Sequence, residues 1–376
     1  RYRPGLARRM RVMLVGPANS IHMSRWFRAL RLRGHEVRMT TQHPDPGSYS
    51  SAERELIDVL PFRGASGYFA NAPALRRAIA SFEPELMNAH YASGYGTTAA
   101  LVGFRPTLLS VWGSDVYDFP YESWWKGRLL RWNLRRATRL ASTSQVMAGQ
   151  TASLAPELMH AFITPFGVDC ERFSPRDERD ARHLTIGTVK TLAPKYGIDL
   201  LVRAFANLLD DARFAAIDRQ RPLRLLLVGG GPDGDALRAL AEELGVAARV
   251  EFAGQVPHAD VPNWLRRLDI YVAASRSDSE SFGVAAVEAS ACGVPVVVSD
   301  AGGLPEVVDH GVTGLVVPRD DVQALAHALG SLVLDPARRA AFGSAGRAHV
   351  LQRYEWERCV DTMVSAYECV VAECKR

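Results

Sequence analysis

The stretch Glu280-Ser-Phe-Gly-Val-Ala-Ala-Val-Glu288 places two carboxylates eight positions apart around a Phe-Gly pair. A strand-like run, Ile270-Tyr-Val-Ala-Ala274, precedes it, and a second run, Val294-Pro-Val-Val-Val-Ser299, follows it. This order predicts a βαβ unit whose helix starts between the two carboxylates, near Phe282. In open parallel sheets a ligand binds at the carboxyl ends of the strands, where such helices begin. The stretch therefore predicts an α/β fold and the place of a binding site.

Strand-like runs alternate with helical patterns on both sides of this unit, which predicts parallel sheets covered by helices. In the first half the runs lie at residues 11–16, 36–40, 85–90, 107–112 and 139–143. In the second half they lie at residues 184–189, 223–228, 249–252, 270–274, 294–299 and 315–317. The alternation breaks at 166–175, which we interpret as a linker. We expect two doubly wound, Rossmann-like domains at 1–170 and 171–354, with a final helix at about 355–376 packing back on the first.

The composition, with 47% hydrophobic and 23% charged residues, is that of an ordinary soluble globular protein. No apolar stretch approaches the roughly 18 residues that span a bilayer. The five cysteines form no Cys-x-x-Cys pair, which argues against a disulfide framework or a zinc site and favours a reducing cytoplasm. We therefore expect a cytoplasmic protein.

The charge differs between the halves. Residues 1–170 hold 21 Arg and Lys against 12 Asp and Glu, whereas residues 171–376 hold 24 against 29. The basic first half is expected to meet something anionic. Four arginines recur there at helical spacing beside an apolar face (Arg128, Arg131, Arg135 and Arg139, beside Trp125, Leu129 and Trp132). This pattern suits an anionic membrane surface, although an ordinary amphipathic helix has the same pattern. No recognition motif for nucleic acid is present, so none is expected as a partner.

The two carboxylates of the opening stretch suit the binding of a sugar nucleotide. A helix start presents free N–H groups and about half a positive charge, which attract a diphosphate. Gly283 lets a ligand approach the backbone. Glu288, placed two turns inside the helix, would reach the vicinal hydroxyls of a ribose, and Glu280 would reach the transferred sugar. The alternative is two acidic residues near a helix start, a position that the helix dipole favours for acids.

The stretch resembles the Glu-x(7)-Glu motif of the retaining glycosyltransferases of family 4. Similar patterns cover residues 187–197, 252–254, 291–296 and 302–314 in the family's order, with weaker matches at Gly16, 88–91 and 112–115. The resemblance implies a GT-B architecture, two domains facing across a cleft, retention of anomeric configuration, and a nucleotide-diphosphate sugar as co-substrate without cofactor or metal. The donor-binding residues that it implies are Gly16, Lys190, Lys195, Gly254, Ser281, Phe282, Gly283, Val284 and Glu288.

Lys190 and Lys195 stand where the family usually has Arg and then Lys, both of which contact the donor diphosphate. A leaving nucleoside diphosphate gains negative charge, which cations must stabilise when no metal is bound. Lysine lacks the bidentate fork of arginine, so the first contact is expected to be looser. We therefore expect Glu280, Lys190 and Lys195 to be catalytic; the alternative is two solvated lysines in a loop.

The acceptor side is expected in the first domain. Many family members have His where this chain has Trp112, so no general base is assigned there. Asp115 is the substitute that we place among the catalytic residues, with turn capping as its alternative. His22, His90 and Trp112 are expected on the acceptor side, although a lone histidine is more often structural.

Two further motifs suggest other chemistry. Residues 229–234 fit Gly-x-Gly-x-x-Gly, typical of an NAD-dependent dehydrogenase, but we interpret them as a tight turn because no acid clearly ends the next strand. Asp233-Gly-Asp235 resembles a metal motif, but helix capping explains both acids. We expect a glycosyltransferase of surface-polysaccharide synthesis with a glycan or lipid-linked acceptor, peripheral to the inner face of the membrane. The alternatives are a nucleotide-sugar epimerase, a dehydrogenase and a non-catalytic glycan-binding protein.

Overall fold

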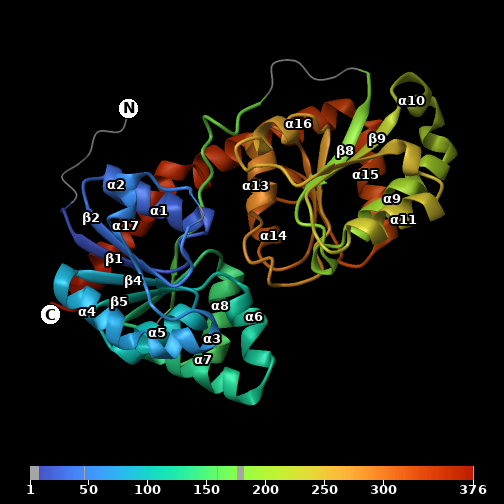
Figure 1. The fold of residues 1–376 in the computed structure, drawn as a ribbon. Helices are drawn as coiled ribbons and strands as arrows, with labels where there is room; N and C mark the ends of the chain where they lie inside the picture. Colours follow the sequence, from blue (N-terminus) through green and yellow to red (C-terminus); the bar gives the residue numbers. More distant parts are fainter. Residues whose placement is uncertain (1–7, 46, 159, 176–181, 376) are drawn as a thin grey trace. The chain divides into compact units, whose positions relative to one another are not determined.

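The computed structural model describes residues 8–45, 47–158, 160–175 and 182–375. It divides into two compact units, each built on one parallel sheet (Figure 1). The first unit contains Arg1–Phe166 together with Glu357–Arg376, and the second contains Gly167–Trp356. The doubly wound α/β fold predicted from the sequence is confirmed in both. Among the described residues, no helix is long and apolar enough to cross a membrane.

The first unit has a seven-stranded sheet in the order β3-β2-β1-β4-β5-β6-β7, with every neighbouring pair parallel. Its central strands are almost wholly buried because helices cover both faces, which explains their mostly apolar sequence. The strands are β1 (Arg11–Val15), β2 (Glu36–Thr41), β3 (Ile57–Val59), β4 (Leu86–His90), β5 (Thr107–Ser110), β6 (Arg139–Ser142) and β7 (Phe162–Ile163).

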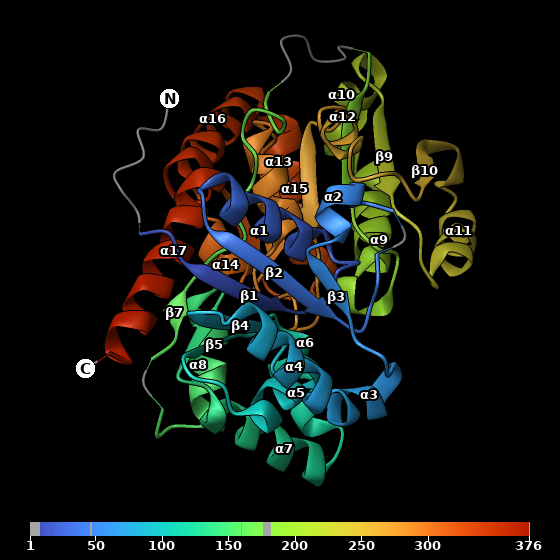
Figure 2. The ribbon, with the colours of Figure 1, turned by 60° about the vertical axis from the view of Figure 1, so that its left-hand side comes forward.

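Helices surround this sheet, and the last helix of the chain is one of them. Figures 1 and 2 show α17 beside β1 and α1. The Tyr367 hydroxyl donates to Asn88 Oδ1 at 2.7 Å, and Arg33 Nη2 lies 2.8 Å from Asp361 Oδ1. The helices are α1 (Ile21–Leu32), α2 (Ser51–Arg54), α3 (Gly64–Ala70), α4 (Ala72–Phe82), α5 (Gly94–Val102), α6 (Ser114–Tyr117), η1 (Phe119–Tyr121), α7 (Trp124–Arg136), α8 (Gln145–Leu154) and α17 (Trp356–Glu373).

The second unit has a six-stranded parallel sheet in the order β10-β9-β8-β11-β12-β13. Its strands are β8 (Leu184–Val189), β9 (Leu223–Val228), β10 (Val250–Gly254), β11 (Ile270–Ala273), β12 (Val296–Ser299) and β13 (Gly314–Val317). Its helices are η2 (Pro194–Tyr196), α9 (Ile198–Asp210), η3 (Ala212–Phe214), α10 (Ala215–Gln220), α11 (Gly234–Glu243), η4 (Ala247–Arg249), α12 (Val261–Leu265), α13 (Val284–Ala291), α14 (Leu304–Val307), α15 (Val322–Leu334) and α16 (Pro336–Arg353).

Both sheets change winding direction beside their first strand. In the second unit the chain runs outward from β8 through β9 to β10, and then returns to place β11 on the other side of β8. In the first unit the same reversal lies between β1 and β4. The loops after the two strands at such a reversal diverge and leave a crevice at the carboxyl edge of the sheet. These two edges are therefore where ligand-binding residues are expected.

Candidate active site

The reversal in the second unit brings Lys190 and Glu280 together. Lys190 directly follows β8, and Glu280 lies in the loop after β11. Lys190 Nζ lies 2.6 Å from Glu280 Oε2, and the side chains are only 19% and 8% exposed. Burial is the largest single effect on the pKa of Lys190 and would lower it, but Glu280, Tyr271 and Tyr196 together outweigh burial and raise that pKa above its usual value. The site thus holds a permanently charged ammonium beside a carboxylate.

Lys195 faces the same aromatic ring as Lys190. The Nζ atoms of Lys190 and Lys195 lie 4.5 and 5.0 Å from the centre of the Tyr196 ring. Such contacts stabilise a cation by roughly 0.5–1 kcal/mol or more and restrict where it points. Burial raises the pKa of Tyr271, which interacts electrostatically with Lys190, to about 12, so that phenol stays neutral. Tyr196 therefore gathers both lysines into one positively charged surface.

The glycine-rich turn after β9 supports the Lys190 loop through close backbone packing. Gly229 and Gly231 have φ angles of 148° and 154°. A Cβ atom on Gly229 would lie 1.9 Å from Lys190 O, and one on Gly231 would lie 2.2 Å from Leu192 O. Lys190 N and Leu192 N also donate to Val228 O and Gly230 O, both at 2.9 Å. The tight-turn interpretation explains these glycines, since their backbone approaches the loop more closely than a side chain permits.

The helix after the Phe-Gly pair starts later than expected. α13 begins at Val284, and its N-cap Gly283 has a φ angle of 83°. The prediction of a start near Phe282 was wrong because Gly283 adopts a left-handed conformation, which no helix interior contains. Glu288 is therefore the fifth residue of α13, little more than one turn inside it. Ser281 is also buried, whereas Val284 is partly exposed beside the helix start.

The side chain of Phe282 lies in the core rather than at the site. It is 3% exposed, and its ring packs edge-on against Tyr354 with centroids 5.4 Å apart. The expectation that Phe282 contacts the donor therefore needs correction, since only its backbone remains for that contact. Gly302 and Gly303 approach the same loop, and Gly303 N donates to Glu280 O at 2.9 Å. These contacts fix the backbone that carries Glu280.

Glu288 is paired with a histidine that sequence reasoning did not single out. Glu288 is 6% exposed, and its Oε1 lies 3.0 Å from His258 Nε2.

Gly254, at the end of β10, has a φ angle of 73° and would meet nothing within 4 Å if it carried a Cβ atom. Gly254 O accepts from Gly229 N at 2.9 Å, so Gly254 adjoins the glycine-rich turn.

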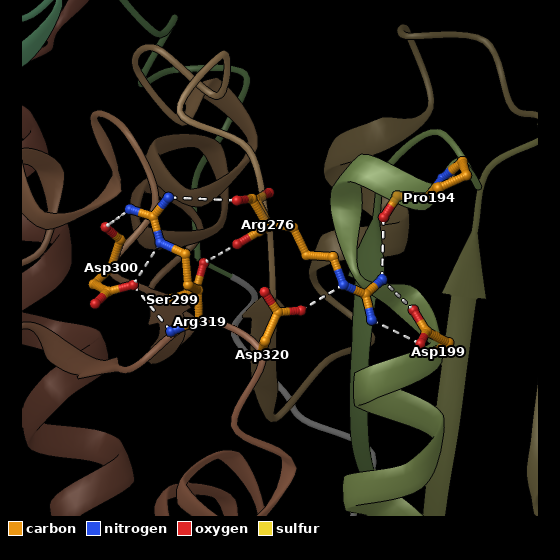
Figure 3. A network of polar contacts seen from close by, with 8 residues as sticks. Pro194, Asp199, Arg276, Ser299, Asp300, Arg319 and Asp320 are labelled. Atoms are coloured by element: carbon orange, nitrogen blue, oxygen red, sulfur yellow. Dashed lines mark hydrogen bonds and ion pairs between the residues drawn. The ribbon is translucent and has the colours of Figure 1, made fainter.

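Arg276 was also missed, and it fixes the loop that carries Lys195. Figure 3 shows its guanidinium between two carboxylates: Nη1 and Nη2 lie 2.7 and 2.8 Å from Asp199, and Nε lies 2.6 Å from Asp320. Nη1 also donates to Pro194 O at 3.1 Å, and Arg276 N donates to Lys195 O at 2.8 Å. Its hydrogen bonds lower the pKa of Asp199, so the pair is charged at neutral pH. Arg276 thus joins the loop after β8 to the end of β11.

A second arginine extends this network along the same edge of the sheet. Arg319 Nε lies 3.0 Å from Asp300 Oδ1 (Figure 3). Arg319 Nη1 lies 2.8 Å from Asp278 Oδ1. Asp278 Oδ1 in turn accepts from Gly302 N at 2.9 Å. The loops after β11, β12 and β13 are therefore connected by charge-assisted hydrogen bonds, which are stronger than neutral ones.

Replacing Arg276 with alanine is expected to weaken the binding of a nucleoside diphosphate about 10-fold, because the Lys195 loop loses its hydrogen bonds to Arg276. Calorimetric titration of the diphosphate measures the effect. The matched control is Arg213→Ala, whose guanidinium binds the neighbouring Asp211 at 2.6 Å on an exposed turn. Affinities that fall equally in both variants, or in neither, would contradict the role of Arg276.

In the first unit, the residues expected on the acceptor side form one aromatic cluster. The His22 ring stacks on Phe166 with centroids 4.0 Å apart, and the Trp112 ring lies edge-on to His22 and His90 at 5.7 and 5.3 Å. Gly16 adjoins them, since a Cβ atom there would lie 2.8 Å from Met23 Cε and 3.4 Å from His90 Cβ. The cluster lies at the reversal between β1 and β4.

His90 is an uncharged imidazole at this edge. Its side chain is fully buried, and neither ring nitrogen has a hydrogen-bond partner among the residues described. Burial, with a smaller effect of His22, lowers the pKa of His90 to about 3. His90 cannot supply a positive charge at neutral pH.

Asp115 caps a turn, which is the alternative that the sequence left open. Its Oδ2 accepts from Ala92 N at 2.7 Å, and its Oδ1 accepts from Trp112 N and Gly113 N at 3.0 and 2.8 Å. The side chain is 1% exposed. Because backbone N–H groups occupy both oxygens, the expectation of a catalytic role for Asp115 is corrected to one of holding the loop after β5.

Two smaller expectations also change. Asp233 is the N-cap residue of α11, but its side chain makes no capping hydrogen bond. Asp233 and Asp235 therefore lie at the start of the helix, as expected, but the Asp233 side chain does not cap it. Arg139 lies in β6 rather than on α7, and it binds Glu373 at 2.6 Å. The helical arginine face therefore ends with α7.

In the part of the chain that is described, no group of three or more His, Cys, Asp or Glu side chains could hold a metal ion.

Two families of glycosyltransferases match this chain. The family described as Glycosyl transferases group 1 matches residues 171–349, and the family Glycosyl transferase 4-like matches residues 11–144. A GDP-mannose-dependent alpha-(1-6)-phosphatidylinositol monomannoside mannosyltransferase of Mycolicibacterium smegmatis is 33% identical over 281 residues, which cover 69% of each chain. A D-inositol 3-phosphate glycosyltransferase of Kribbella flavida is 36% identical over 54% of this chain, which spans about half (49%) of that relative.

Among solved structures, sucrose-phosphate synthase from Thermosynechococcus elongatus superposes with a TM-score of 0.82 at 22% identity, covering 97% of this chain and 100% of that one. This similarity shows the fold. The resemblance predicted from the sequence is confirmed, and the chain belongs to the group 1, family 4-like glycosyltransferases of GT-B fold.

Proposed function

We propose that the protein transfers a sugar from a nucleotide-diphosphate sugar, bound by the second unit, to a glycan or lipid-linked acceptor that the first unit meets. The observation that supports this most is the pairing of Lys190 with Glu280 at 2.6 Å, beside Lys195, at the winding reversal. The names of the relatives make GDP-mannose the first donor to test, with phosphatidylinositol mannoside or inositol phosphate as acceptor.

The lysines support the departure of the diphosphate without a metal ion. As the bond from the anomeric carbon to the phosphate oxygen breaks, negative charge grows on that oxygen, and Lys190 and Lys195 stabilise it. Glu280 is placed to bind hydroxyls of the transferred sugar, and Glu288 those of the ribose. We infer that the acceptor oxygen attacks from the face that the diphosphate leaves, and that the diphosphate takes the acceptor proton. Attack from this face retains the anomeric configuration.

The test is to incubate the protein with GDP-mannose or other sugar nucleotides, with and without each acceptor. Release of nucleoside diphosphate together with a glycosylated acceptor in the retained configuration, followed by NMR, would support the proposal. Conversion of the donor to another sugar nucleotide without an acceptor would instead identify an epimerase. Binding of sugar with no release of diphosphate would identify a glycan-binding protein.

We propose further that α7 and η1 contact an anionic membrane from the cytoplasmic side. Three aromatic side chains are exposed at the end of η1 and the start of α7, namely Tyr121, Trp124 and Trp125 at 67%, 78% and 48%. Arg128, Arg135 and Arg136 on the same helix are also exposed. Exposed tryptophans beside arginines suit the lipid interface, where each basic residue contributes about 1 kcal/mol. This location would bring a lipid-linked acceptor to the protein.

Replacing both Trp124 and Trp125 with alanine is expected to lower the fraction that sediments with phosphatidylglycerol vesicles about 10-fold, because both side chains lose their apolar contact with the lipid. The matched control is Leu32→Ala, which removes an apolar side chain that is 88% exposed elsewhere in the first unit. Wild-type protein that does not sediment, or sedimentation that salt does not weaken, would contradict membrane contact through this surface.

A further inference from the structure

His258 lies between two charged side chains of the second unit. Its Nε2 lies 3.0 Å from Glu288 Oε1, and its Nδ1 lies 3.3 Å from Arg172 Nη2. Arg172 also donates to the backbone oxygen of His258, so it is held against this loop from outside. Glu288 is 6% exposed, whereas the His258 side chain is 33% exposed. The three residues form a chain of contacts from the surface to the buried carboxylate.

The two neighbouring side chains determine which nitrogen of the imidazole carries the hydrogen. A guanidinium has only donors, so His258 Nδ1 must accept from Arg172. An ionised carboxylate has only acceptors, so His258 Nε2 must carry hydrogen and donate to Glu288. These two contacts together select the tautomer with hydrogen on Nε2, as in other sites where the partner of one ring nitrogen determines the role of the second. His258 thus binds Glu288 in a fixed direction.

This contact leaves Glu288 one oxygen for a ligand. Oε1 is bound to His258, and Oε2 has no protein donor among the residues that the structure describes. Without His258, the carboxylate can rotate about its last side-chain bond and would have to be fixed by the ligand itself. Groups that a neighbouring side chain holds in the productive orientation lose less entropy when the ligand binds.

We propose that His258 is a positioning residue which, supported by Arg172, orients the Glu288 carboxylate toward the vicinal hydroxyls of the donor ribose. His258 thereby sets the preference for ribonucleotides over nucleotides without these hydroxyls. The inference rests on the proposed role of Glu288 as the ribose-binding residue. It adds to that role a residue in a different loop, between β10 and α12, which neither touches the sugar nor takes part in the chemistry.

The experiment compares nucleoside diphosphates with and without ribose hydroxyls. Calorimetric titrations use GDP, UDP and their 2′,3′-dideoxy forms on the full chain, and the better-bound pair is then followed in the variants. Wild type is expected to bind the ribonucleotide at least about 10-fold more tightly, since a hydrogen bond to a charged group is stronger than one between neutral groups. His258→Ala is expected to lose most of this preference by weakening ribonucleotide binding alone.

Two further variants separate positioning from packing. His258→Gln is expected to restore the preference, because its amide oxygen can accept from Arg172 while its NH₂ donates to Glu288. His258→Phe keeps a ring of similar size without hydrogen bonds and is expected to behave like His258→Ala. His327→Ala, which changes an exposed histidine on α15, is the control for a change of overall charge and stability.

The outcomes distinguish failure of the positioning role of His258 from failure of the ribose-binding role of Glu288. If His258→Ala and His258→Phe weaken both forms of the nucleotide equally, or neither form, the positioning role is overturned while the ribose role of Glu288 stands. If wild type binds the ribonucleotide and its dideoxy form equally well, the ribose-binding role of Glu288 is contradicted, and the positioning role of His258 is contradicted with it. If neither diphosphate binds to wild type, the proposed donor site itself is wrong.

Discussion

Replacing Lys190 with alanine is expected to lower turnover at least about 100-fold, because one of two cations that stabilise the departing diphosphate is lost in a largely water-excluded site. The side chain is 19% exposed, so bulk water cannot replace its charge efficiently. The measurement is the initial rate of nucleoside diphosphate release at saturating donor and acceptor. The loss is expected mainly in kcat, since the charge develops as the bond breaks.

Lys190→Arg is the matched control for this variant. It keeps the positive charge and supplies the residue type that the family usually has at this position, so it is expected to retain far more activity than Lys190→Ala. Thermal unfolding of both proteins distinguishes lost chemistry from lost structure. A folded Lys190→Ala protein with near wild-type turnover would contradict the proposed role of this lysine.

Replacing Glu280 with alanine is expected to reduce turnover by a similar factor and also to destabilise the second unit. Removing one partner of a buried ion pair leaves the other charge unpaired, at a cost of roughly 3 kcal/mol in the free energy of unfolding. Glu280 is the more buried of the two, at 8% exposure. Turnover and the urea midpoint of unfolding are the two measurements.

The double variant tests whether the two residues act as one unit. Lys190→Ala combined with Glu280→Ala is expected to lose much less turnover than the product of the two single effects, and to regain part of the stability, because no unpaired charge remains. Strictly multiplicative losses in turnover together with additive losses in stability would mean that the 2.6 Å contact couples nothing, and that each residue acts alone.

The central strands could be predicted because burial on both faces leaves a strong apolar signal. β1, β8 and β9 all fell within the predicted runs. β3 and β7 were missed because they are edge strands of only three and two residues, too short for any periodicity. The start of α13 was misplaced by two residues because the conformation of Gly283 depends on how its loop packs.

The site was predictable where a residue's position relative to a strand end determined its place. Lys190 directly follows β8, so its location at the carboxyl edge followed from the sequence. The role of Asp115 did not, because its hydrogen bond to Ala92 N joins two loops that only the folded sheet brings together. His258 and Arg276 were missed for the same reason, since their partners lie 30 and 77 residues away in the chain.

The packing of α17 on the first unit makes that unit discontinuous along the chain. Tyr367 donates to Asn88 across 279 residues, so the second unit must be synthesised before this contact can form. During synthesis, the surface of the first unit on which α17 packs therefore stays exposed while the second unit is synthesised and folds. Fragments that end at the boundary near Phe166 are expected to aggregate, whereas co-expression with a separate α17 peptide should rescue them.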